Sequence, residues 1–155
     1  TERVANYISS KVGGDIVKIE AAQPYTSQEL NYNIQNNRPE TIRKSAEGSL
    51  RRLGVERIDL YYQHRIDPKV PAEEVAGVMF ELIKEGKIAH WGVSEADEEY
   101  LRKAHAVCPI TAIQNRYSMM FREYEKLFPV LEELNIGFVA FSPLANGFLS
   151  AKYNV

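Results

Sequence analysis

A histidine that follows an apolar segment is the strongest single candidate for chemistry in this sequence. Residues 58–62 read IDLYY, which predicts a strand, and Gln63 and His64 follow it directly. Parallel β/α barrels carry their catalytic side chains at the carboxyl ends of strands. An imidazole placed there can donate a hydrogen bond to an oxygen that gains negative charge during a reaction. Because a lone histidine at a strand end is more often structural or solvated, the neighbouring segments must decide its role.

Other residues of suitable chemical type have simpler explanations. His105 and Cys108 have a spacing that could suit a metal-binding pair, but no second pair accompanies them. The pair Gly13-Gly14 is too short for a nucleotide-binding glycine motif. Trp91 lies in a predicted strand and is interpreted as a core residue. The basic residues of the first predicted helix are interpreted as a solvated face: Arg43, Lys44, Arg51 and Arg52.

From residue 39 onward, amphipathic helical segments alternate with short apolar segments. Pro39 and Pro71 open two helices, Gly54 and Gly86 end them, and Asp97 is the predicted N-cap of a third. Four helices are predicted, over residues 39–53, 71–86, the segment after 97, and 123–134. Four strands are predicted, over residues 58–62, 88–93, 111–114 and 136–141. The predicted inward-facing helix residues are Ile42, Ala46, Leu50, Leu53, Val75, Val78, Met79, Leu82, Ile83, Leu101, Ala104, Leu127, Leu131 and Leu134.

The predicted strands begin at a steady spacing, with one helix in each gap. Their starts near residues 58, 88, 111 and 137 are separated by roughly 25–30 residues, which is typical of repeated β/α units and a parallel sheet. An eight-stranded barrel and a doubly wound open sheet use similar spacings. Periodicity therefore predicts the α/β class but leaves these two architectures open.

Residues 1–36 are organised differently. Residues 1–12 predict an amphipathic helix, and residues 15–20 predict a strand. The following stretch, 21–38, is polar and has no clear period, and such a long segment between a strand and a helix is unusual in a compact domain. We therefore predict two units, residues 1–36 and residues 37–155, that join near residues 31–38.

Sequence motifs after residue 36 occur in an order and spacing that carry a family resemblance. They are NRPE (37–40), IRK (42–44), EGSLRRL (47–53), IDLYYQHR (58–65), KEGK (84–87), GVSEA (92–96), AIQ (112–114), YS (117–118), FSPL (141–144) and GFL (147–149). In this combination, residues 37–155 resemble the second half of an aldo-keto reductase. The resemblance implies a partial (β/α)8 barrel of about four β/α units. It also implies an enzyme that transfers hydride from NADPH to an aldehyde or ketone, or runs the reverse oxidation.

The resemblance assigns His64 to the catalytic position of the family. The family histidine orients the substrate carbonyl and hydrogen-bonds its oxygen, which needs stabilisation as hydride arrives. A tyrosine then supplies the proton as general acid, with its pKa lowered by a lysine. The family's Asp, Tyr and Lys are not recognisable here. Lys11 echoes the lysine segment but lies at the end of a predicted helix, and Tyr7 and Tyr25 have no motif around them.

The same resemblance assigns the cofactor contacts. Ser94 and Gln114 match positions that hydrogen-bond the nicotinamide carboxamide, and Glu95 stands where many members carry an Asn. Phe141 matches an aromatic ring that stacks against the nicotinamide. Three residues match the loop that runs along the pyrophosphate, where backbone amides can bind phosphate oxygens: Ser142, Leu144 and Gly147.

The first 36 residues resemble a short piece of a flavodoxin-like domain. Residues 1–5 look like the end of its phosphate loop, and residues 15–20 with Pro24-Tyr25-Thr26 look like its second strand and following loop. Because the first strand and the other loop hydroxyls of such a domain are not recognisable, we do not expect FMN to bind. A flavin-binding module is nevertheless an alternative function.

Composition narrows the classes of function. The chain has 155 residues, 45% hydrophobic and 26% charged, with a net charge of −2, so nothing points to nucleic acid as a partner. No apolar run approaches the ~20 residues of a membrane span and no secretory leader is recognisable. One cysteine, Cys108, permits no intramolecular disulfide, which suits a cytoplasmic protein.

The prediction is therefore a partial barrel with an extra N-terminal helix and strand. It belongs to an NADP(H)-dependent reductase of small carbonyl compounds and is inactive as this incomplete chain. A non-enzymatic fusion or truncation remnant is the main alternative. A half-barrel has unpaired strand edges, so we also expect self-association through them.

Overall fold

The computed structural model describes residues 37–151. Several predictions fall on residues 1–36 and lie outside the described residues. They are the N-terminal helix and strand, the flavodoxin-like segment, and the residues Lys11, Tyr7 and Tyr25. The division of the chain into units at residues 36 and 37 stays a prediction for the same reason.

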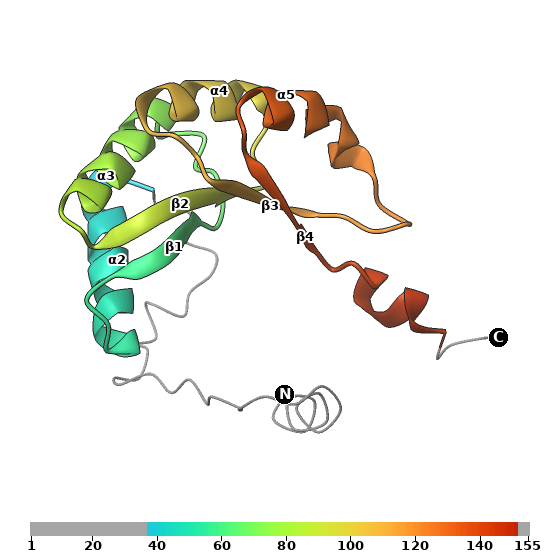
Figure 1. The fold of residues 1–155 in the computed structure, drawn as a ribbon, viewed down its shortest axis with the longest axis horizontal. Helices are drawn as coiled ribbons and strands as arrows, with labels where there is room; N and C mark the ends of the chain where they lie inside the picture. Colours follow the sequence, from blue (N-terminus) through green and yellow to red (C-terminus); the bar gives the residue numbers. More distant parts are fainter. Residues whose placement is uncertain (1–36, 152–155) are drawn as a thin grey trace.

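Within the described residues, helices alternate with four strands. The elements are α2 (Pro39–Leu53), β1 (Ile58–Gln63), α3 (Ala72–Lys84), β2 (Ile88–Ser94), α4 (Glu98–Val107), β3 (Ala112–Arg116), the 3-10 helix η1 (Glu123–Leu127), α5 (Phe128–Glu133), β4 (Gly137–Phe141) and the 3-10 helix η2 (Ala145–Ser150). The strands form one sheet in which each neighbouring pair is parallel. The helices α2 to α5 follow one another along the outer side of the curved row of strands (Figure 1).

The strand order distinguishes the two architectures that the spacing left open. The strands lie in the order β1-β2-β3-β4, so each β/α unit adds its strand next to the previous one. A doubly wound sheet reverses this order at a switch point, whereas a barrel does not. The described residues therefore form four β/α units of barrel type, as the sequence predicted.

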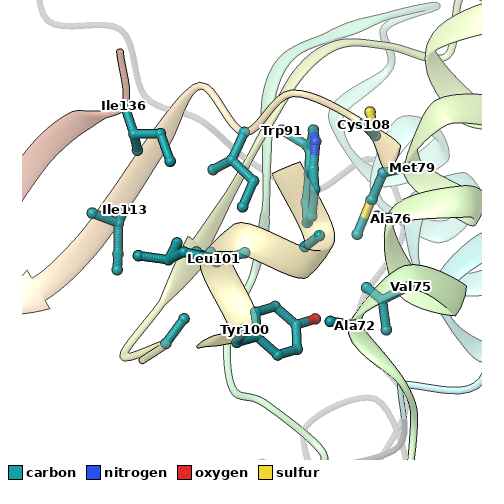
Figure 2. Close-up of a cluster of buried hydrophobic side chains, with 14 of the residues drawn as sticks. Ala72, Val75, Ala76, Met79, Trp91, Tyr100, Leu101, Cys108, Ile113 and Ile136 are labelled. Atoms are coloured by element: carbon teal, nitrogen blue, oxygen red, sulfur yellow. The ribbon is translucent and has the colours of Figure 1, made fainter. Parts of the chain in front are cut away.

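The core lies between the outer face of the sheet and the helices. The strand residues Trp91, Val93 and Ile113 have no solvent exposure, and they belong to one cluster with Leu82 and Leu101 from α3 and α4. Figure 2 shows Trp91 and Ile113 among side chains of these helices. Each fully buried aliphatic or aromatic side chain contributes about 1.5–3 kcal/mol to stability. The interpretation of Trp91 as a core residue is confirmed.

The predicted helix ends are confirmed with small shifts. Gly54 takes a left-handed conformation (φ 66°), and its N–H donates to carbonyls of the last turn of α2. Asp97 caps α4 by accepting a hydrogen bond from the backbone N–H of Tyr100 at 2.8 Å. Pro71 precedes α3 instead of occupying its first position, a shift of one residue. These local signals act within one turn, which is why the sequence shows them.

No described helix packs over the inner face of the sheet. Leu60 and Val139 are 36% and 37% exposed, and His90 is also exposed. The Tyr62 ring lies across Gly92: a Cβ built on Gly92 would be 2.6 Å from its Cε1 atom. Among residues 37–151, then, one face of the sheet is packed and the other is accessible.

Two predictions about α2 are wrong. Leu53 is 48% exposed instead of inward-facing, and Arg52 is 9% exposed instead of solvated. The guanidinium of Arg52 lies over Gly48, whose missing side chain leaves room for it. A long aliphatic stem can be buried in this way while the charge finds partners. Arg52 is also near Tyr61, where burial raises the pKa to about 12 and the Arg52 charge opposes that rise.

The helix predicted over 123–134 is instead two helices. A 3-10 helix, Glu123–Leu127, precedes the α-helix Phe128–Glu133. Pro129 lies in the first turn of the second helix. Because proline has no N–H, it cannot donate to a carbonyl of the preceding turn, and one continuous α-helix is interrupted there. Leu127 and Leu131 are nonetheless buried as predicted.

Candidate active site

The predicted site residues gather at one edge of the sheet. His64 follows the last residue of β1, Ser94 is the last residue of β2, and Phe141 is the last residue of β4. Gln114 of β3 is paired in register with Ser94. Because all four strands run in the same direction, their carboxyl ends meet at the same edge (Figure 1). Barrel enzymes use this edge for catalysis.

His64 is exposed, and its ring makes no hydrogen bond within residues 37–151. Its backbone carbonyl accepts a hydrogen bond from Nη1 of Arg65 at 2.7 Å. The backbone of the histidine is therefore held by its neighbour, while both ring nitrogens remain available to a ligand. This arrangement suits a residue that donates to an external oxygen.

Ser94 and Gln114 are brought into direct contact. The Ser94 hydroxyl, only 3% exposed, donates to the backbone carbonyl of Gln114 at 2.8 Å and accepts from Nη1 of Arg65 at 3.2 Å. The Gln114 side chain is half-buried and has no hydrogen bond within the described residues. Its amide group can therefore offer both a donor and an acceptor to a ligand.

The loop after β4 is a compact series of turns on the surface. Ser142 has φ 53°, Asn146 φ 56° and Gly147 φ 96°, all in the left-handed region. The N–H groups of Ala145, Gly147 and Leu149 donate to carbonyls within the loop. Leu144 is 57% exposed. Because Gly147 already donates within the loop, any phosphate contact must use other N–H groups of this segment.

No tyrosine of the described residues has the lowered pKa that a proton-donating tyrosine of this family needs. Burial raises the pKa values of Tyr61 and Tyr100 to about 12, and it also raises those of Tyr62 and Tyr124. A hydrogen bond to Glu125 raises the pKa of Tyr117. The general acid is therefore not identified within residues 37–151.

Three site-edge residues were missed at the sequence level. Arg65 pairs with Glu95, its Nε lying 3.4 Å from Oε2, and the fully buried Asn115 accepts a hydrogen bond from the Glu95 N–H at 2.7 Å. Asn37 donates to the carbonyl of Arg65 at 2.7 Å. The available signal was a polar residue, Asn115, in a predicted β/α unit; the partners themselves are 20 or more residues apart in the sequence.

In the described part of the chain, His105 and Cys108 do not belong to any group of side chains that could hold a metal ion. Nδ1 of His105 accepts from the backbone N–H of Ile110 at 3.1 Å. Residues 37–151 contain no group of three side chains arranged to hold a metal. In the same range, no helix has both the length and the apolar character that a membrane crossing requires.

Comparisons with known proteins find relatives that are aldo-keto reductases and solved structures with the same arrangement of strands and helices. A probable aldo-keto reductase from Glycine max is 48% identical over 115 residues, which are 74% of this chain and 33% of that protein. The glycerol dehydrogenase structure from Gluconobacter oxydans is 38% identical with a TM-score of 0.75, covering 77% of this chain and 37% of its own. The aldo/keto reductase of Klebsiella pneumoniae in complex with NADP and acetate is 32% identical with a TM-score of 0.61, covering 68% and 38%.

The chain thus spans between 33% and 38% of the length of these relatives. The model of the Aldo/keto reductase family matches residues 3–155, which includes most of the N-terminal segment. The flavodoxin-like interpretation of residues 1–36 receives no support from any comparison. The chain belongs to the aldo/keto reductase family.

Proposed function

We propose that this chain forms part of an NADP(H)-dependent reductase of small aldehydes or ketones. The observation that carries the proposal is the Ser94–Gln114 contact at the carboxyl edge of the sheet, between His64 after β1 and Phe141 at the end of β4. This edge combines an unengaged imidazole, a free amide group and an aromatic ring. Those are the groups needed to bind a carbonyl oxygen and a planar amide-bearing ring.

His64 is the proposed carbonyl-binding residue. NADPH supplies a hydride when it is bound, and negative charge then develops on the carbonyl oxygen of the substrate. The exposed His64 ring, with its backbone held by Arg65, donates a hydrogen bond to that oxygen. Gln114 and Ser94 would bind the carboxamide, Phe141 would stack on the ring, and the loop 142–147 would hold the phosphates.

Lys11 is the proposed lysine partner of the general acid. The family match begins at residue 3, so the segment Ser9-Ser10-Lys11 lies inside it. This extent supports the echo of the family's lysine segment at Lys11. Its ammonium would lower the pKa of a tyrosine and so ease proton donation.

A turnover assay tests the proposal. We expect no NADPH oxidation by the 155-residue chain alone, because it spans only 33–38% of the length of its relatives and no general acid has been identified in it. We expect activity from a chimera in which residues 37–151 replace the matching segment of the Gluconobacter oxydans glycerol dehydrogenase, with glyceraldehyde among the substrates. In that chimera His64→Ala should lower kcat by about 10²–10³-fold, whereas Lys84→Ala, an exposed control on the outer helix α3, should have a small effect.

Two outcomes would contradict this proposal. Full activity of the His64→Ala chimera would remove His64 from the reaction. Turnover by the isolated chain would show that its own residues supply the acid.

We also propose that the isolated chain self-associates through its accessible inner face and strand edges, which sedimentation measurements over a range of concentrations would test.

A further inference from the structure

The last residue of β3 brings a guanidinium to the inner face of the sheet, at the edge where the candidate site lies. Side chains alternate between the two faces of a strand. Ile113 is fully buried against the helices, so Gln114 and Arg116 belong to the opposite, inner face. Arg116 is paired in register with Phe141 of β4. It therefore lies at the carboxyl end of β3, next to the strand end that carries Phe141.

The loop after β3, which projects beyond the carboxyl end of that strand (Figure 1), folds back and supports this guanidinium with an aromatic ring. The N–H groups of Ser118 and Phe121 each donate to the other's carbonyl at 3.1 Å, which closes a tight turn. Cζ of Arg116 lies 4.8 Å from the centroid of the Phe121 ring, a favourable distance for a cation over an aromatic face. The turn thus holds the ring against Arg116 and limits the directions that its guanidinium can take.

The guanidinium of Arg116 has no anionic partner in the described part of the chain. Within residues 37–151 it has the Phe121 ring beside it but makes no hydrogen bond or ion pair. Arg122, six residues later, differs, because its Nε lies 2.6 Å from Oε1 of Glu125. Arg116 is half-buried, and burial of a charge is costly unless the charge is paired. Its position therefore favours an anionic ligand, and the planar fork of a guanidinium fits a carboxylate through two parallel hydrogen bonds.

We propose that Arg116 binds a carboxylate of the substrate, so that the reductase acts on carbonyl compounds that carry an acidic group. This inference rests on the proposed function and adds the class of substrate to it. Neighbouring strands lie about 4.8 Å apart, so the ends of β1 and β3, with β2 between them, are about 10 Å apart. The long Arg116 side chain spans part of this gap. A short keto acid can therefore place its carbonyl at His64 and its carboxylate at Arg116.

The test compares two ketones that differ in charge. 4-Oxopentanoate carries a carboxylate, and its methyl ester has the same carbonyl and carbon chain without the charge. Dissociation constants for the 155-residue chain come from NMR titrations of backbone amide signals in the loop after β3, and the side-chain Nε–H signal of Arg116 reports direct contact. A charge-assisted pair at a half-buried position predicts that the acid binds about tenfold more tightly than the ester. Binding of the acid should also weaken as the salt concentration rises.

Variants separate recognition from folding. Arg116→Met should reduce the preference for the acid to about one, whereas Arg116→Lys should keep part of it, because an ammonium has the charge but not the planar fork. Phe121→Leu removes the supporting ring and should weaken the acid but not the ester. Arg122→Met is the matched control, because that arginine is already paired with Glu125, and it should leave the preference unchanged. Arg116→Gln replaces Arg116→Met if circular dichroism shows that the latter does not fold.

NADP⁺ separates a substrate carboxylate from the phosphates of the cofactor, which have the same chemistry toward a guanidinium. NADP⁺ that leaves the Arg116 Nε–H signal and the affinity for the acid unchanged supports the substrate carboxylate. Displacement of the acid by NADP⁺ would assign Arg116 to a phosphate and overturn the inference. Equal binding of acid and ester, or a preference that survives Arg116→Met, would also overturn it, but not the proposed function, which is tested by turnover of the chimera.

Discussion

Replacement of Gly92 by alanine tests the packing of the inner sheet face. Gly92 lies in β2 opposite Ala112 of β3. A Cβ at this position would lie 2.7 Å from the carbonyl oxygen of Ala112 and 2.6 Å from Cε1 of Tyr62. The Tyr62 ring can rotate away, but the carbonyl belongs to the backbone of a paired strand. The substitution therefore requires the sheet to shift.

The expected cost follows from that distinction. Overpacking in a well-packed region costs about 1–3 kcal/mol, and the rigid backbone contact places Gly92→Ala within that range. With a urea m-value of about 1–3 kcal/mol/M, a loss of about 2 kcal/mol lowers the unfolding midpoint by about 1 M. Gly92→Ala combined with Tyr62→Leu should recover only part of the loss, because the carbonyl of Ala112 remains.

The matched control is Gly77→Ala in α3. A Cβ on Gly77 would meet no atom within 4 Å beyond its chain neighbours and the backbone of its own helix, and alanine is favoured over glycine in a helix interior by about 0.5–1 kcal/mol. The same chemical change should therefore stabilise the chain at position 77 and destabilise it at position 92. Urea unfolding followed by tryptophan fluorescence measures both. Equal unfolding midpoints for the two variants would refute the argument.

Further predictions concern buried and surface polar pairs. Tyr100 donates a buried hydrogen bond at 2.7 Å to Oε1 of Gln63, so Tyr100→Phe should lower the free energy of unfolding by about 1–3 kcal/mol in urea titrations; no change would show that water replaces the hydroxyl. A hydrogen bond from Lys87 lowers the pKa of Glu47. Its stabilising effect is therefore present above the ordinary carboxyl pKa and is lost as pH falls through the lowered value. Lys87→Met should move acid unfolding, followed by circular dichroism, to higher pH; an unchanged midpoint would show that the ion pair is screened by solvent.

Most of the fold could be predicted from the sequence because its signals are local. Helix ends at Gly54 and Asp97 depend on residues within one turn, and the alternation of helices and strands depends on short hydrophobic periods. The exceptions lie inside two predicted helices, where packing and a proline changed the expected outcome. Arg52 is buried because Gly48 leaves space for it, and Pro129 divides the predicted fourth helix.

The candidate site was predicted in part. The family resemblance identified His64, Ser94, Gln114 and Phe141, and the parallel strands place all four at one edge. Their roles stay proposals. The resemblance did not identify the network that holds Glu95, because its contacts join residues that are far apart in sequence.

The sequence by itself determined the class of fold, the order of the β/α units and the residue types at each strand end. Only the tertiary structure decided that the strands follow one another without reversal, that Arg65 reaches both Ser94 and Glu95, and that Asn115 fixes the turn between them. The physical reason is that hydrophobic periodicity and capping act within a few residues. Hydrogen bonds between strand ends instead depend on register, which is set when the whole sheet assembles.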